Sequence, residues 1–60
     1  MSPAPAFSDQ CAAMSRESLL NYRYSLSLRI AGCERRGQDT EPTRQMIETV
    51  REEMRKRGML

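Results

Sequence analysis

The sequence predicts an all-α protein, an antiparallel hairpin of two helices that dimerises into a four-helix arrangement. Apolar residues of the C-terminal third recur at helical spacing on one side, whereas those of residues 19–33 fall on two helical stripes. Both segments also end in a charged turn followed by glycine, Glu34-Arg35-Arg36-Gly37 and Arg55-Lys56-Arg57-Gly58. The repeated ending predicts two successive helices, over about residues 15–36 and 41–57.

Self-association is expected because the chain is short. Sixty residues form one domain at most, and such a domain buries only about 60% of the surface of its unfolded chain. The hydrophobic fraction of 38% is low, and small domains offset such a deficit with disulfides, a metal or oligomerisation. There is no His, and Cys11 and Cys33 lack the spacing of zinc ligands. We therefore expect a homodimer without metal or cofactor.

The N-terminal residues divide into a tail and a short helical segment. Residues 1–7 carry two prolines and no periodic pattern, which predicts a flexible tail. Residues 8–60 are then the single helical-hairpin domain. Ser8 or Asp9 can cap a turn through Met14, and Ser15 can cap the next helix. These signals fit one helix or two.

The C-terminal helix has start and stop signals at both ends. Asp39 or Thr40 serves as N-cap after a loop over residues 37–40, and Gly58 occupies the usual position of a terminating glycine. The apolar residues between these signals form one stripe, and charged residues lie away from it. This helix is expected to have one buried face and one solvated face.

Residues 20–30 can be read with two periods. Apolar and polar residues alternate without a break, which is typical of a half-buried strand. However, β-branched residues are nearly absent, and no turn pair such as Asn-Gly supplies a second strand. At helical spacing the same residues form two stripes. The helix is favoured. If residues 20–30 formed a strand instead, the alternative fold would be a ribbon-helix-type α+β dimer.

The two stripes define the expected core and the expected interaction surface. The expected hairpin core comprises Leu19, Tyr22, Leu26, Ile30, Met46, Ile47, Val50 and Met54. The expected partner or dimer interface comprises Leu20, Tyr24, Leu28, Ala31 and Arg23. Tyr and Arg often anchor protein interfaces, which directs attention to this second set. The pattern also permits the reverse assignment of stripes to hairpin and dimer.

The composition argues against several functions. Without His there is no general base suited to neutral pH, and the sequence has no Gly-rich phosphate loop or recognisable carboxylate pair, so no catalytic residues are expected. The net charge of +2 is a weak footprint for a dedicated nucleic-acid binder. No secretion signal and no membrane-spanning run is evident. We expect a cytoplasmic, non-enzymatic protein with reduced cysteines.

The layout resembles that of a known group of small helical proteins. The pattern Leu19-Leu20-x-Tyr22-Arg23-x-Ser25-Leu26, a glycine-ended helix, and then Thr40-x-x-x-Arg44 to Arg57-Gly58 is similar to small bacteriophage early proteins of helical-hairpin type. These include quorum-sensing anti-activators. The resemblance implies a phage-encoded homodimer in the bacterial cytoplasm that inhibits a host regulatory protein, such as a transcription activator, by binding it.

The alternative fold implies another partner. In ribbon-helix-helix repressors a two-stranded ribbon reads the major groove of DNA. The polar residues that would face the bases are Asn21, Arg23, Ser25, Ser27 and Arg29. That family has two helices after the strand, whereas residues 32–37 are too few for the first of them. A small dimeric DNA-binding regulator remains the second hypothesis.

Overall fold

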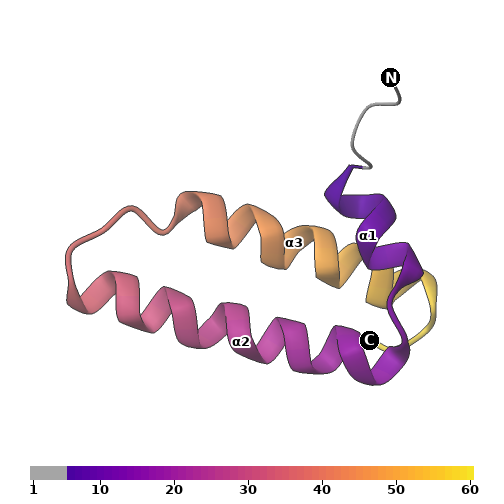
Figure 1. Cartoon of the computed structure of the whole chain (residues 1–60). Helices are drawn as coiled ribbons and strands as arrows, with labels where there is room; N and C mark the ends of the chain where they lie inside the picture. The colour runs from indigo at the N-terminus through magenta and orange to yellow at the C-terminus, as the bar shows by residue number, and fades with distance from the viewer. Residues whose placement is uncertain (1–5) are drawn as a thin grey trace.

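The computed structural model describes residues 6–60, which form three α-helices and no strand (Figure 1). Helix α1 spans Phe7–Ala13, α2 spans Arg16–Arg35 and α3 spans Glu41–Lys56. The prediction of an all-α fold is confirmed. The expected two-helix hairpin is corrected to three helices, because the segment before Ser15 forms a helix of its own.

The alternative α+β fold is wrong, because residues 20–30 lie entirely within α2. The alternating pattern arises from apolar rows on opposite sides of one helix, and the intervening polar residues suit that helix as well. The Ser25 hydroxyl donates to the carbonyl of Asn21, and the Ser27 hydroxyl to that of Arg23, each at 3.1 Å. Short hydroxyl side chains that bond the preceding turn are compatible with helix, so they do not require a strand.

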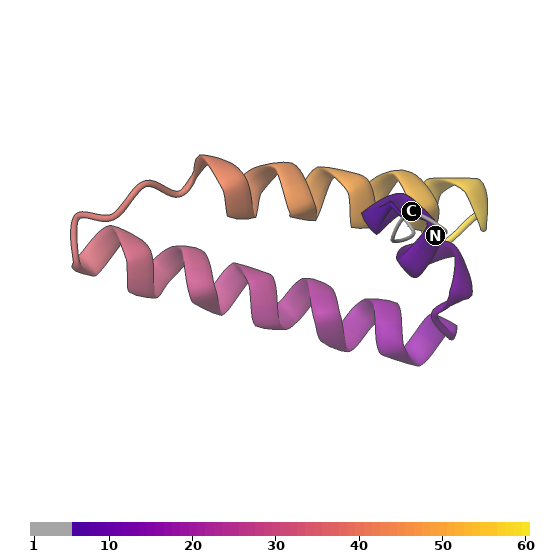
Figure 2. The ribbon, with the colours of Figure 1, turned by 45° about the horizontal axis from the view of Figure 1, so that its top comes forward.

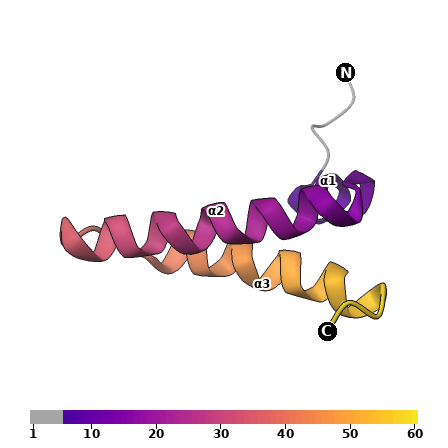
Figure 3. The ribbon, with the colours of Figure 1, turned by 90° about the horizontal axis from the view of Figure 1, so that it is seen from below.

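Helices α2 and α3 run antiparallel, side by side, and α1 lies against the C-terminal half of α3 (Figures 1 and 2). Seen from below, α2 has no other described element in front of it (Figure 3). The buried centre combines residues of all three helices: Cys11, Leu19, Leu26, Val50 and Met54. One side of α2 therefore faces this core, and its opposite side faces away from the molecule.

Helix α1 is held by aromatic and polar contacts. Phe7, assigned above to the tail, instead begins α1, and its ring centroid lies 5.8 Å from that of Tyr22. At the other end of α1, the Arg57 guanidinium donates to the carbonyls of Cys11 at 3.2 Å and Ala12 at 3.0 Å. A cation there satisfies terminal carbonyls of the helix and complements its dipole. Residues 1–5 of the expected tail lie outside the described residues.

The helix ends follow capping chemistry. The Ser15 hydroxyl accepts from the Ser18 N–H at 3.1 Å at the start of α2. Gly37 and Gly58 have φ of 67° and 72°, the left-handed conformation that glycine adopts without a Cβ clash. After α2, Gln38 N–H donates to the Cys33 carbonyl at 2.9 Å; after α3, Met59 N–H donates to that of Met54, also at 2.9 Å. Both helices thus end in the same Schellman motif.

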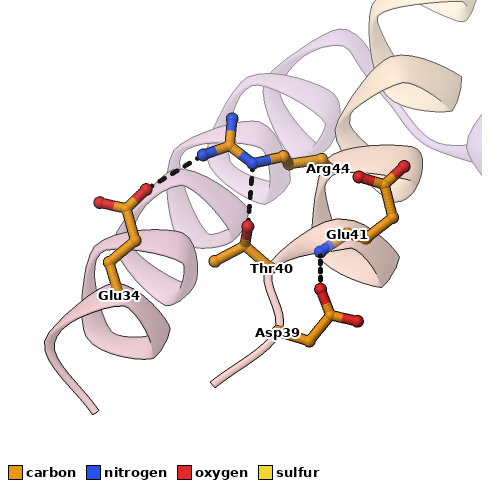
Figure 4. Close-up of polar contacts among 5 residues, drawn as sticks. All are labelled: Glu34, Asp39, Thr40, Glu41 and Arg44. Atoms are coloured by element: carbon orange, nitrogen blue, oxygen red, sulfur yellow. Dashed lines mark hydrogen bonds and ion pairs between the residues drawn. The ribbon is translucent and has the colours of Figure 1, made fainter. Parts of the chain in front are cut away.

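The loop between α2 and α3 is fastened by side chains from both sides (Figure 4). The Asp39 carboxylate accepts from the Glu41 N–H at 3.0 Å, which caps the first turn of α3. Arg44 donates through Nε to the Thr40 hydroxyl at 2.9 Å and through a terminal nitrogen to Glu34 at 3.0 Å. The Arg44–Glu34 pair is more than half exposed, so it positions the loop and adds little stability.

Candidate interaction site on the outer face of α2

Two apolar rows lie on opposite sides of α2. The inner row faces the core: Leu19 and Leu26 are fully buried, Tyr22 is partly buried against them, and Ile30 is partly buried near the loop end. Their partners on α3 are Val50 and Met54, fully buried, and Met46 and Ile47, partly buried. The inner row packs α2 against α3, and the opposite face of α2 lies away from this contact.

The outer row of α2 consists of Leu20, Tyr24, Leu28 and Ala31, which we call the outer face. Spacings of four, four and three residues put these side chains on one side of the helix. Leu20 is 46% exposed, Leu28 56% and Tyr24 67%, and Ala31 is exposed as well. Three large apolar side chains thus stand in line on one exposed side of α2.

Arg23 lies beside the outer face and not within it. It is exposed, but it precedes Tyr24 by one residue and is therefore turned by about 100° around the helix axis. The structure thus brings four members of the expected interface together and places the fifth on their flank.

The sequence did not predict a shallow groove that lies between α1 and α3. It measures about 320 Å³ and is lined by Phe7, Pro42, Gln45, Met46 and Thr49. The groove exists because α1 brings Phe7 over α3. None of its lining side chains is titratable at neutral pH, so it offers packing space and no acid–base chemistry. An isolated Phe after two prolines carried no periodic signal that would have revealed it.

The two cysteines occupy different environments and are both free thiols. Cys11 is buried in the core, whereas Cys33 is partly exposed near the end of α2. Burial raises the pKa of the Cys11 thiol above its usual value of 9.0; Glu53 adds to the rise and Arg57 opposes it. A thiol with a raised pKa stays protonated and weakly nucleophilic, so Cys11 acts as an apolar packing residue.

The described residues provide little else on which to build a site. Within residues 6–60, no cluster of three or more His, Cys, Asp or Glu side chains could hold a metal ion. No helix in that range is both long enough and apolar enough to cross a membrane. No protein-family model matches the chain, and neither curated proteins nor solved structures give a significant match. Among the described residues, the outer face of α2 is therefore the strongest candidate for a binding surface.

Proposed function

We propose that this protein is a small non-enzymatic inhibitor or modulator that acts by binding another protein through an interface built on α2. In this proposal the chain forms a homodimer in which α2 and α3 of the two copies make a four-helix arrangement, is encoded by a phage, and works in the cytoplasm of the bacterial host. Its target is a host regulatory protein such as a transcription activator. The observation that carries the proposal is the row of exposed apolar side chains on the outer face.

The energetic argument starts from exposed area. Full burial of a Leu-sized side chain contributes about 1.5–3 kcal/mol. Leu20, Tyr24 and Leu28 are each about half exposed or more, so covering them contributes a corresponding part of that energy. Contiguous apolar patches on small soluble proteins mark interaction sites more often than scattered residues do. Tyr24 combines a large ring with a polar hydroxyl, the chemistry that is enriched at binding hot spots. The composition of the face thus favours a protein partner.

The DNA-binding alternative receives no support from the fold. A ribbon-helix-helix regulator needs residues 20–30 as a strand, and these residues are helical. Arg23 and Arg29, which would have read bases from such a ribbon, do not share one side of α2, because six residues correspond to about 600° of rotation. We therefore retain only the protein-binding proposal.

The proposal is tested by a pair of substitutions that add the same charge. Tyr24→Arg places a cation in the outer face, whereas Gln38→Arg places one in the exposed loop between α2 and α3. Tagged wild type and both variants are used to capture proteins from host lysate. A protein captured by wild type is then purified, and its activity is measured with each variant.

We expect wild type and Gln38→Arg to bind and inhibit the captured protein, and Tyr24→Arg to fail at both while keeping its helical circular dichroism. Loss of binding by Gln38→Arg as well, or full inhibition by Tyr24→Arg, would exclude the outer face. If neither wild type nor Gln38→Arg changes the activity of the captured protein, the inhibitory role is contradicted.

A further inference from the structure

We infer that the outer face of α2 packs against the same face of a second copy of this chain, antiparallel, with Glu17 of each copy opposite Arg35 of the other. The inference rests on the proposed function, because it takes the outer face to be an interaction surface, and it commits that surface to self-association. The host protein then meets a preformed dimer.

The first support is the charge at each end of the outer face. Glu17 lies seven residues before Tyr24, and Arg35 lies seven residues after Leu28. Seven residues are almost two helical turns, so both charged side chains share the face with the apolar row. Both residues are exposed, and among the described residues neither takes part in an ion pair. The face begins with a carboxylate and ends with a guanidinium.

The second support is the symmetry of four residues of this face about the level of Leu26 along the helix axis, although the side chain of Leu26 itself belongs to the inner row. Glu17 lies nine positions before Leu26 and Arg35 nine after it; Tyr24 lies two before and Leu28 two after. In a two-fold interface, residue i of one copy meets residue j of the other and j meets i. An antiparallel pair centred at Leu26 therefore sets Tyr24 against Leu28 and Glu17 against Arg35, twice each.

The remaining residues fit the same register. Leu20 lies six positions before Leu26 and Ala31 five after it, one position away from exact two-fold mates, so the large side chain lies next to the small one. A parallel pair would instead set Glu17 against Glu17 and Arg35 against Arg35, and like charges that face each other repel. A partner of unrelated sequence requires no relation between the two ends of the face. The matched ends thus point to a second copy in antiparallel orientation.

Charge reversal tests whether a second copy covers the outer face and whether that copy is antiparallel. Sedimentation equilibrium gives the dimer dissociation constant at low salt for wild type, Glu17→Arg, Arg35→Glu and the double variant. Each single variant should dissociate about tenfold more readily, because two attractive pairs per dimer become repulsive. The double variant should recover wild-type affinity. An equimolar mixture of the two single variants should associate at least as tightly as wild type, because every pair becomes Arg opposite Glu.

Glu48→Arg is the matched control, since it makes the same charge change on the exposed side of α3. Its dissociation constant should equal that of wild type. Circular dichroism of each single variant, and recovery in the mixture, separate loss of association from loss of folding. A monomeric wild type at millimolar concentration would overturn the inference. The inference would also be overturned if Glu48→Arg dissociated as readily as Glu17→Arg, or if the mixture of the two single variants stayed monomeric.

These outcomes are separable from those of the proposed function. If wild type is monomeric but Tyr24→Arg still abolishes binding to a purified host protein, the outer face belongs to that protein, and only the self-association is wrong. If the charge swap behaves as expected but no host protein is bound, the dimer stands and the inhibitory function does not.

Discussion

Helices α2 and α3 end in the same motif, yet their outward sides differ. The outward side of α3 carries polar residues, all of them exposed: Glu41, Gln45, Glu48, Glu52 and Arg55. The outward side of α2 carries Leu20, Tyr24 and Leu28, each about half exposed or more. α3 is thus a one-sided amphipathic helix that closes the hairpin. α2 performs that task with one face, and its opposite apolar face stays exposed.

The difference between the two faces of α2 is tested most strongly by shortening one leucine on each face. Leu26 is 1% exposed and Leu28 is 56% exposed. Leu26→Ala should lower the free energy of unfolding by about 2–5 kcal/mol, because it leaves a cavity in the core. Leu28→Ala should lower it by less than about 1 kcal/mol at dilute protein, where association contributes least. Urea denaturation measures both, and equal losses would contradict two distinct faces.

Two arginines near the end of α3 differ in what they contact. Arg57 bonds the carbonyls of Cys11 and Ala12 and pairs with Glu53 at 2.9 Å, whereas Arg55 pairs with Glu52 in a setting that is more than half exposed. Arg57→Met should lower the free energy of unfolding by about 1–3 kcal/mol, because charged hydrogen bonds to α1 are lost.

The matched variant is Arg55→Met, for which the expected change is below about 1 kcal/mol. Thermal unfolding compares the two variants, and hydrogen exchange of the amides of α1 reports its docking directly. Unchanged protection of α1 in Arg57→Met would show that Arg57 does not hold this helix.

Gly32 lies in the body of α2, whereas Gly37 lies just after its C-terminal end. A Cβ at Gly32 would meet only the Arg36 guanidinium, at 3.6 Å, so Gly32→Ala should raise the free energy of unfolding by up to about 1 kcal/mol. Gly37 has φ of 67°, and Gly37→Ala should lower it by about 1 kcal/mol. Melting temperatures that move in the same direction would contradict this account of the C-terminal motif.

The smallest expected effect comes from the pH dependence of the buried thiol. Because the folded pKa of Cys11 is raised above its usual value of 9.0, the unfolded chain loses this proton first as pH increases. The stability contributed by the neutral thiol is complete below about pH 9 and is lost as pH rises through the folded pKa. Cys11→Ala should remove this component while other groups titrate as before. Parallel stability curves for wild type and Cys11→Ala would contradict it.

The sequence predicted the long helices better than it predicted their neighbours. Stripes, caps and terminal glycines are local signals, so α2 and α3 lie within a residue or so of the expected ranges. α1 depends instead on distant contacts, the ring of Tyr22 and the guanidinium of Arg57. Such contacts leave no periodic trace in seven residues. The groove beside Phe7 was missed for the same reason.

The outer face was identified from the sequence as one of two stripes and assigned to the expected interface, but the reverse assignment stayed open. Periodicity separates Leu20, Tyr24 and Leu28 from the inner row without saying which row meets α3. That choice depends on three-dimensional packing, which buries Leu19 and Leu26 and leaves the other row exposed. The alternation that mimicked a strand reflects the same two-sidedness.

The most direct measurement follows the exposure of Tyr24 in solution. In the Tyr22→Phe variant, Tyr24 is the remaining tyrosine and an aromatic ring is kept beside Phe7. Acrylamide quenching of its fluorescence is recorded across a series of protein concentrations. If the outer face pairs with that of a second copy, quenching falls as the chain associates, because the ring, 67% exposed in the single chain, becomes covered. If the protein associates and quenching does not fall, the account is contradicted, because Tyr24 is then not covered. Quenching that stays at its dilute value at every concentration tested would contradict it as well.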